Sequence, residues 1–536
     1  MRPLIVDALA RGQGKRVATR DVIGAGPRAV AGVLETRGIK PRIALAESVL
    51  DGGVDLGGHD MLLASGMSSD LRAIRRVVLR WRARAEGPVL IGGPVASDPE
   101  RAILKAGADL CVIGEGESTL RELLDLGLGE GRLPDTEGLG KIRGIAYLDE
   151  GAVRVNPLRP VMKRGVYDGL MPSTNAVMDY PLYRSARVYV EVLRGCSNYH
   201  RARISLPAGD CAGCGRCQKG RLEERYDCPK GVPPGCGYCS VPSLFGPPKS
   251  RSMDRIMEEI GGLLSKGVRR IVLSAPDFLD YGRDLLVEPE PLTDPEHPEP
   301  NYSALEGLLS RLTGLDNVLE GRASVMVENV KPCLVTRRAA DILGRHLAGT
   351  SVNIGLETGS AEHAIQLGRT SSPEENLQAV ERLGRAGLKP YVYFIHGLPG
   401  QTSETVDETV ECIGRSVEAG ASRVILYRFR PLPMSAFQDQ PMAPPAAKDR
   451  LGKRIYDAAR EANMRLKEDL RGEKLRVVIA EPFERDKRYH VAYPMLHGPV
   501  VLVDGATGLA GEVVDVEIVG VVSDRIVRGR LLDGTF

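Results

Sequence analysis

The cysteines of this chain are the residues whose type and spacing most clearly point to chemistry. Seven of the ten lie between residues 194 and 239. A C-x2-C-x2-C run is followed by a fourth cysteine that precedes a proline; these are Cys211, Cys214, Cys217 and Cys228. A separate C-x2-C pair and one upstream cysteine complete the stretch: Cys236, Cys239 and Cys196. Thiolates in such tight turns can converge on a metal centre.

The inner four cysteines have more than one interpretation. The pattern "CAGCGRC…CP" is like a ferredoxin-type run that binds an iron–sulfur cluster, although ten residues rather than three precede its last cysteine. A structural zinc site is the main alternative, and plain reduced cysteines are the third. We expect two sites, with the inner four cysteines forming an auxiliary centre, either a second 4Fe-4S cluster or zinc.

Composition limits the setting in which these thiols work. No apolar run reaches the roughly 18–20 residues of a membrane span, and the N-terminus carries no secretory signal pattern. We therefore expect a cytoplasmic protein with no membrane partner, in which clustered cysteines indicate metal rather than disulfides. A net charge of +2 argues against a strongly electrostatic nucleic-acid binder.

The elements that must position these residues form an α/β protein. Residues 1–150 alternate short apolar strands with helices, which predicts a Rossmann-like, doubly wound parallel sheet. Ligands bind beyond the carboxyl ends of such strands. Three turns at those ends are candidate binding residues, although glycines also end strands without binding anything: Ser65, Gly66, Met67, Gly92, Gly93, Gly114, Glu115, Gly116 and Glu117.

The rest of the chain divides into three parts. The segment "YLDEGAVRVNPLRP" (147–160) suggests a hairpin, residues 151–187 form a linker, and residues 188–470 repeat about six strand–helix units. This repetition predicts a partial (β/α) TIM-type barrel with its site at the strand C-termini, interrupted by the cysteine-rich insert 197–235. Residues 471–536 are β-rich with glycine turns, which predicts a small antiparallel, OB-like β-barrel.

The segment "RGC…CGYCS", without its insert, resembles the C-x3-C-x2-C loop of the radical S-adenosylmethionine (SAM) superfamily. The resemblance implies that Cys196, Cys236 and Cys239 hold a 4Fe-4S cluster whose open iron binds SAM. Tyr238 matches the aromatic residue before the third cysteine. The insertion departs from the family pattern, and His200 stands at the usual position of the second cysteine.

Later segments resemble the same superfamily and imply further SAM contacts. "NIGLETGS" resembles the fourth barrel strand, where Glu357 would bind the ribose. "YFIHGLPGQT" resembles the fifth strand, which would place three residues near the adenine: Gly397, Leu398 and Pro399. In place of a GGE-like turn the chain has "SAPD", which makes Asp277 the candidate for holding the SAM amine.

The N-terminal region resembles the cobalamin-binding domain that precedes many radical SAM enzymes, on "LLASGM", "VLIGGPVASDPERAI" and "ADLCVIGEGESTLREL". It lacks the D-x-H-x-x-G signature of a lower-ligand histidine. The resemblance implies bound cobalamin at the three turns. The C-terminal strands resemble the TRAM domain, an RNA-binding barrel of methylthiotransferases and tRNA methyltransferases, on "GEVVDVEIVGVVSDRIVRGRLL".

These resemblances imply a radical SAM enzyme that methylates an unactivated carbon. An electron donor such as a ferredoxin or flavodoxin would reduce the cluster, SAM would yield a deoxyadenosyl radical, and cobalamin would deliver the methyl group. RNA, in particular tRNA, is the expected substrate. One alternative is a methylthiotransferase-like enzyme acting on tRNA or a ribosomal protein. Against it, the N-terminal region has only Cys111, whereas methylthiotransferases use three cysteines there. A non-catalytic iron–sulfur RNA-binding protein is the other alternative.

Overall fold

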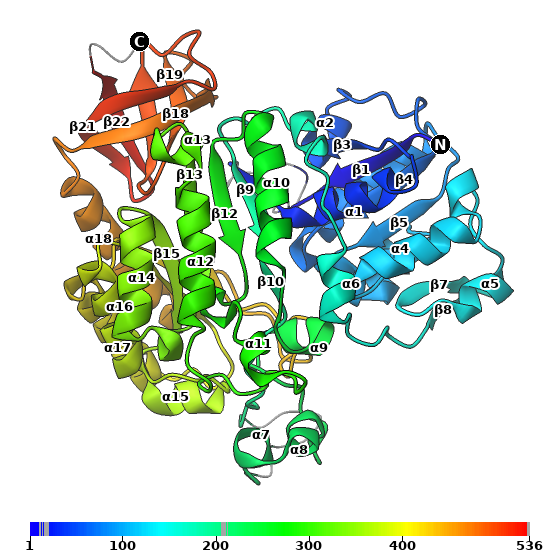
Figure 1. Ribbon diagram of the computed structural model, residues 1–536, viewed down its shortest axis with the longest axis horizontal. Coiled ribbons are helices and arrows are strands. Elements are labelled where there is room, and N and C mark those ends of the chain that lie inside the picture. Colours follow the sequence, from blue (N-terminus) through cyan, green and yellow to red (C-terminus); the bar gives the residue numbers. More distant parts are fainter. Residues whose placement is uncertain (10–11, 13, 15–20, 205–210, 212, 533–536) are drawn as a thin grey trace. The chain divides into compact units, whose positions relative to one another are not determined.

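The computed structural model describes residues 1–9, 12, 14, 21–204, 211 and 213–532 (Figure 1). Part of the predicted insert and the last four residues of the predicted C-terminal barrel lie outside the described residues. The chain divides into two compact units. The first contains residues 1–190 and 251–268, and the second contains residues 191–250 and 269–536.

The first unit is built on a seven-stranded sheet in the order β3-β1-β4-β5-β6-β7-β8. Five strands are parallel: β3 (Arg42–Leu45), β1 (Pro3–Asp7), β4 (Met61–Ser65), β5 (Val89–Gly92) and β6 (Leu110–Val112). Their order reverses between β1 and β4, as in flavodoxin-like sheets, and ligands bind at such a switch point. The predicted hairpin, β7 (Ile145–Asp149) and β8 (Ala152–Val155), adds two antiparallel strands at the edge.

The helices of the first unit are α1 (Ala25–Glu35), α2 (Ala46–Leu50), α3 (Leu71–Arg82), α4 (Gly116–Asp125), α5 (Thr136–Lys141) and α6 (Arg164–Asp168). A short π-helical segment, Arg101–Lys105, precedes β6.

Helix α10 (Met253–Ser265) packs in the first unit, although it follows the cysteine loop in sequence. A buried ion network explains this placement. Arg28 of α1 pairs with Glu259 of α10 at 2.8 Å, and Arg251 pairs with the same carboxylate at 2.6 Å. Because unpaired buried charges are costly, the two arginines and the glutamate require one another.

The second unit holds the strands of the predicted partial barrel, which is confirmed. Two parallel strands, β12 (Arg270–Ser274) and β13 (Ser324–Val327), pair together. Four more form a parallel sheet: β14 (Asn329–Val330), β15 (Ser351–Glu357), β16 (Lys389–His396) and β17 (Arg423–Arg428). A short antiparallel pair, β10 (Leu193–Arg194) and β11 (Lys249–Ser250), flanks the cysteine loop. Strand β9 (Arg187–Glu191), which pairs with β2 (Val22–Ile23), spans the boundary between the units.

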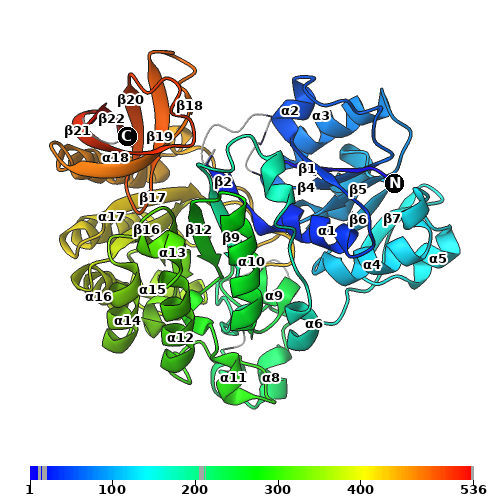
Figure 2. The same cartoon turned by 45° about the horizontal axis from the view of Figure 1, so that its top comes forward.

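Helices cover the outer side of the four-stranded sheet, as the two views of Figures 1 and 2 show. The long ones are α12 (Tyr302–Thr313), α14 (Arg337–Leu347), α16 (Pro373–Arg385) and α17 (Ser403–Glu418). Short helices occupy the connections: α7 (Arg216–Lys219), α8 (Leu222–Tyr226), α9 (Val241–Phe245), α11 (Asp284–Val287), α13 (Asp316–Leu319) and α15 (Ala361–Gln366).

Helix α16 shows how the sequence places such an element. Ser372 and Glu375 form a reciprocal capping box, in which each side chain accepts the other's backbone N–H. Pro373 stands at the first helical position, where its missing N–H costs nothing. Leu377 and Val380 recur at helical spacing and are buried. Packing of this buried face fixes the helix, which leads directly into β16.

The C-terminal segment forms a closed five-stranded barrel, as predicted. Its strands are β18 (Lys474–Pro482), β19 (Tyr489–Pro494), β20 (Val500–Asp504), β21 (Val513–Ser523) and β22 (Ile526–Leu531). Pairing is antiparallel except between β20 and β22. Helix α18 (Arg450–Glu468) leads into it. Its identity as a TRAM domain stays a prediction. No helix in the described parts of the chain is both long and apolar enough to cross a membrane.

Candidate active site

The three cysteines that resemble a radical SAM loop come from two segments of the second unit. Cys196 follows β10, and Cys236 and Cys239 lie just before α9. The Cys196 N–H donates to the Gly246 carbonyl at 3.0 Å, and the preceding Gly195 has a φ of 93°. Besides burial, the charge of Cys236 raises the pKa of Cys196 and of Cys239, and the charge of Cys196 raises that of Cys239. The structure thus brings Cys196 beside a pair 40 residues away in sequence.

Asn198 connects the two segments. Its backbone N–H lies 3.4 Å from the sulfur of Cys196, and its side-chain amide lies 3.3 Å from the sulfur of Cys236. The same amide donates to the Gly368 carbonyl at 3.0 Å. Sequence reasoning missed this residue because no spacing rule distinguishes an asparagine two positions after a cysteine. Hydrogen bonds to ligand sulfurs stabilise thiolate charge and tune a bound cluster.

Burial favours the protonated form of two of the three thiols. It raises the pKa of Cys196 to about 11 and that of Cys239 to about 12. The nearby Lys331 ammonium opposes the rise at Cys196. Metal ligation requires thiolates and releases their protons. A group of buried thiols of this kind is suited to binding a metal cluster.

Across the described parts of the chain, no three Cys, His, Asp or Glu side chains are drawn together as ligands of a single metal ion. This finding concerns one-ion geometry. In a four-iron cluster each cysteine binds a different iron, so the ligands stand farther apart than around one ion. The three thiols therefore fit a cluster by type, by convergence and by the donors that face their sulfurs.

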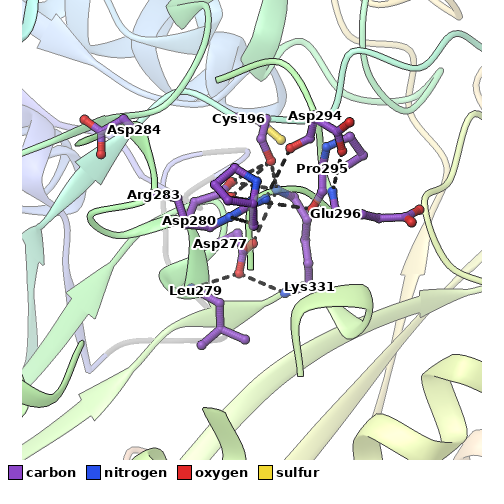
Figure 3. A network of polar contacts seen from close by, with 12 residues as sticks. Cys196, Asp277, Leu279, Asp280, Arg283, Asp284, Asp294, Pro295, Glu296 and Lys331 are labelled. Carbon is purple, nitrogen blue, oxygen red and sulfur yellow. Dashed lines mark hydrogen bonds and ion pairs between the residues drawn. The ribbon is translucent and has the colours of Figure 1, made fainter. Parts of the chain in front are cut away.

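Asp277 lies in a buried charge network below Cys196 (Figure 3). Its Oδ1 accepts the backbone N–H groups of Leu279 and Lys331, and its Oδ2 lies 3.3 Å from the Lys331 ammonium. That ammonium also donates to Asp280 and Ser197, both at 2.6 Å. Burial raises the pKa of Asp277, which the Lys331 charge partly offsets.

Asp280 is the better-stabilised carboxylate of this network. Burial alone would raise its pKa, but Lys331 and Arg283 hold it below its usual range. Arg283 pairs with it directly and donates to the carbonyls of Asp294, Pro295 and Pro298 (Figure 3). Ser197, next to Cys196, also donates to Asp280 at 3.0 Å. The network therefore fixes the backbone on which the first cysteine stands. Sequence reasoning did not identify Lys331.

Glu357 ends β15 beside the second cysteine segment. Its φ is 69°, and the pairing of β15 with β16 carries a bulge between Gly355 and Glu357. Such irregularities re-aim side chains at functional sites. Burial raises the pKa of Glu357, and the Arg369 charge and a hydrogen bond from Tyr238 counter it.

Arg369 joins Glu357 to the cysteines and was not predicted. Its guanidinium lies 3.8 Å from the Glu357 carboxylate and 3.1 Å from the Tyr238 hydroxyl, and it also reaches the sulfur of Cys236 at 4.0 Å. Tyr238 and Glu357, both predicted from the resemblance, are therefore brought to the same place.

The residues expected near an adenine follow β16. The Gly397 N–H donates to the Gln401 side chain at 2.7 Å, and the Pro399 carbonyl contacts the His363 ring at 2.8 Å. Leu398 is buried in a cluster with Phe429 and Phe437. The turn is thus rigidly held at the carboxyl end of the barrel strand, where this fold places its sites.

The predicted ligand-binding turns of the first unit lie at the carboxyl ends of β4, β5 and β6. Met67 is 38% exposed, and nothing lies within 4 Å of a Cβ placed on Gly92. This open, partly apolar edge leaves room for a bulky ligand. Glu115 is instead buried and accepts the Met162 N–H at 2.6 Å. The remaining turn residues, Ser65, Gly66, Gly93, Gly114, Gly116 and Glu117, lie at the same sheet edge.

The four inner cysteines surround one hollow of the second unit. Cys211, Cys214, Cys217 and Cys228 all line it, together with Arg201 and other basic residues. The hollow has a cavity volume of about 20 Å³. The structure therefore separates seven cysteines into the two groups that the spacing indicates.

Comparison with known proteins identifies the superfamily to which part of the second unit is similar. The family model of the radical SAM superfamily matches residues 227–413. The match includes Cys236 and Cys239 and begins after Cys196, as a split loop requires. An uncharacterised protein of Methanopyrus kandleri is 43% identical over 531 residues, covering 99% of this chain and 96% of the relative. A tRNA-2-methylthio-N(6)-dimethylallyladenosine synthase of Clostridium novyi is 23% identical over 53% of this chain and 59% of its own length.

Solved structures share the fold over most of the chain. The radical SAM methyltransferase TsrM of Kitasatospora setae, with cobalamin and a [4Fe-4S] cluster bound, superposes with a TM-score of 0.57 at 16% identity, over 82% of this chain and 77% of its own. The cobalamin-dependent SAM radical enzyme OxsB, with aqua-cobalamin bound, gives a TM-score of 0.53 at 14% identity, over 77% of this chain and 52% of its own. At these identities the likeness establishes the fold.

Proposed function

This chain belongs to the same family as the M. kandleri protein and is a radical SAM enzyme, and from that premise we propose that it methylates an unactivated carbon with the help of cobalamin. The observation that carries the proposal is the fold. A doubly wound sheet followed by a partial barrel is shared with TsrM over 82% of this chain, and that structure contains both cobalamin and a [4Fe-4S] cluster.

The second unit supplies the residues for SAM chemistry. Cys196, Cys236 and Cys239 would hold the cluster, with Asn198 donating to two of the sulfurs. Glu357 would bind the SAM ribose, and its buried carboxylate is positioned by Arg369. With the cluster and SAM bound, these residues would hold the groups that supply radical hydrogen abstraction from the substrate, and cobalamin would supply the methyl group.

The first unit supplies a surface for cobalamin. The turns after β4 and β5 are open at Gly92 and present the exposed Met67. Ala8 donates its N–H to the Ser65 carbonyl at 2.8 Å, which fixes the switch point between β1 and β4. Ligands of open α/β sheets bind at such a point. No histidine stands in these turns, so cobalamin would bind there without a lower ligand from them.

RNA, in particular tRNA, is the substrate that we propose. Two observations support it: the closed C-terminal barrel, which we propose to be a TRAM domain, and the relatives whose names state a tRNA product. Several arginines of the barrel are paired with carboxylates: Arg530 lies 2.6 Å from Glu517 and Arg488 lies 2.7 Å from Asp486. Recognition would therefore rest on shape and stacking more than on charge.

Sulfur transfer is the second candidate, since the methylthio-synthase relatives favour it. Cys111 argues against it. It is the single cysteine of the first unit's sequence, it is fully buried in β6, and burial raises its pKa to about 12. Such a thiol is inert. The first unit therefore lacks the thiols that a sulfur-carrying cluster would need.

The test is anaerobic reduction of the purified protein by a low-potential one-electron donor in the presence of SAM. We expect formation of 5′-deoxyadenosine, one cobalt per chain after reconstitution with cobalamin, and transfer of label from [methyl-³H]SAM to RNA. Label transfer accompanied by sulfur incorporation would favour methylthiolation. Absence of deoxyadenosine from a protein that holds its cluster would leave a non-catalytic iron–sulfur protein and overturn the proposal.

A further inference from the structure

The hollow in the cysteine-rich insert has a lining unlike the rest of the second unit. Four thiols line it: Cys211, Cys214, Cys217 and Cys228. All four are free, and the charges of the first two act on the pKa of Cys217. Residues that share no secondary structure therefore bring four sulfurs to one place. Four convergent thiols in a reducing compartment are a metal-ligand set.

Arg201 lies against these thiols. It is 3% exposed, and it donates to the carbonyls of Arg225 at 2.8 Å and Tyr226 at 3.3 Å. Its Nε is buried and has no hydrogen-bond partner. The thiols of Cys217 and Cys228 are its electrostatic neighbours, and Cys228 is its hydrogen-bond partner. The guanidinium also donates to the Tyr199 carbonyl, but within the described parts of the chain no carboxylate pairs with it, and thiolates at Cys217 and Cys228 would supply the opposite charge.

The remaining lining carries the same sign of charge. Three further basic residues, Arg203, Arg216 and Lys230, line the hollow with one carboxylate, Glu224. Glu224 lies 3.8 Å from Arg216, which partly neutralises it. The surroundings are thus positive overall, and positive surroundings stabilise a group that carries net negative charge. A metal centre bound by four thiolates is such a group.

We propose that Cys211, Cys214, Cys217 and Cys228 bind a second iron–sulfur cluster, seated in the insert and paired with Arg201. Iron–sulfur is favoured over zinc by the spacing. Structural zinc sites combine two separated cysteine or histidine pairs, whereas three cysteines at C-x2-C-x2-C are like the ferredoxin-type run of [4Fe-4S] clusters, with the fourth cysteine here following after ten residues. Because four thiolates saturate such a cluster, it offers no open iron and cannot bind SAM.

One chain segment contacts the ligands of both proposed clusters. Only two residues separate Asn198, which contacts Cys196 and Cys236, from Arg201. His200 donates its N–H to the Asn198 side chain at 3.0 Å, and its carbonyl accepts the Gly235 N–H at 2.8 Å. A single fixed segment therefore contacts both cysteine groups. The proposal stands independently of whether the enzyme transfers a methyl group.

The test compares two multiple variants of the full chain. The insert variant replaces Cys211, Cys214, Cys217 and Cys228 by serine, and the SAM-loop variant replaces Cys196, Cys236 and Cys239 by serine. After anaerobic reconstitution with iron and sulfide, we expect about eight irons in the wild type and about four in each variant. Electron paramagnetic resonance of the reduced SAM-loop variant should show a cluster signal that SAM does not change.

Two outcomes would overturn the proposal: one zinc per chain and about four irons in the wild type, or a SAM-loop variant that binds no iron. The SAM-loop variant leaves the insert intact, so the test does not depend on folding of the insert variant. Failure of the methylation proposal is read separately, from label transfer by the wild type.

Arg201 offers a second measurement. Arg201→Gln removes a positive charge beside the cluster. Loss of this charge favours the oxidised form of the cluster, so we expect a more negative midpoint potential for the SAM-insensitive signal. Arg201→Lys retains the charge and should keep the midpoint potential close to that of the wild type. The matched control is Arg221→Gln, an exposed arginine of the same insert outside the hollow. Equal potentials in all four proteins would place the cluster elsewhere.

Discussion

The side-chain amide of Asn198 lies 3.3 Å from the sulfur of Cys236, a residue 38 positions later in the chain. This hydrogen bond joins the segments of the first and second cysteines, which the insert separates in sequence. It also gives the loop a donor that would persist when the thiol becomes a thiolate.

We expect Asn198→Ala to weaken the SAM cluster without unfolding the protein. Removing a group that orients a metal ligand typically costs about 10–100-fold in affinity or activity. SAM cleavage should fall by that factor, and iron should be lost faster to a chelator. The control is Asn329→Ala, whose amide donates to the Ala275 carbonyl at 3.4 Å. If Asn198→Ala cleaves SAM at the wild-type rate, the bond has no role in the site.

Lys331→Met should destabilise the second unit. The change leaves Asp277 without a cation, while Asp280 keeps Arg283. Breaking a buried pair typically costs about 3–5 kcal/mol. Thermal unfolding of the apo-protein measures the loss. Adding Asp277→Asn removes the orphaned charge and should recover part of the stability, whereas no recovery would show that the ammonium acts through Asp280 alone.

Gly237→Ala should disturb the cysteine loop. A Cβ on Gly237 would overlap the ring of Phe437, whose N–H donates to the Gly237 carbonyl at 2.8 Å. Overpacking of this kind costs about 1–3 kcal/mol. Phe437→Leu in the same chain should relieve the overlap. As a control, Gly261→Ala has nothing within 4 Å of the added Cβ and lies inside α10, so it should be neutral or stabilising.

Acidification should loosen the second unit through His497. Burial and the nearby cations Lys389, Lys467 and Arg423 lower its pKa from 6.5 to about 3. Between those values the unfolded chain binds a proton that the folded chain does not. Stability is therefore complete above about pH 6.5 and falls as the pH drops below it.

The pH effect is measured by comparing melting at pH 7 and pH 5. Because the ring is partly exposed, we expect His497 to account for about 1 kcal/mol of the loss at pH 5. His497→Gln can still hydrogen-bond the Tyr391 hydroxyl, which now contacts the ring at 3.0 Å. The variant should lose less stability on acidification, and an identical pH profile would contradict the assignment.

The regular elements were predictable because their hydrophobic periodicity is local. The run over 389–396 is a buried barrel strand, and the helix over 403–418 shows a clear apolar face. Strand β19 escaped prediction because the charged residues before it, such as Arg485 and Lys487, obscure its short apolar run. The placement of α10 could not be predicted either, since Glu259 pairs with Arg28, which lies 231 positions earlier in the chain.

The candidate site likewise contains some residues that could be predicted from the sequence and others that could not. Cysteines have spacing rules, so Cys236 and Cys239 could be read as a pair, and family resemblance added Glu357. Asn198, Lys331 and Arg369 carry no such rule. Their positions beside the cysteines arise only when separate strands converge, and a sequence contains no local trace of that convergence.

The buried pairing of Arg28 with Glu259 has an evolutionary consequence. The chain passes between the two units three times, after residues 190, 250 and 268. A single recombination point could therefore not add or exchange the first unit intact, because the half of the ion network on α10 would stay behind with the cysteine loop. An exchange of the first unit would therefore have to carry residues 251–268 with it.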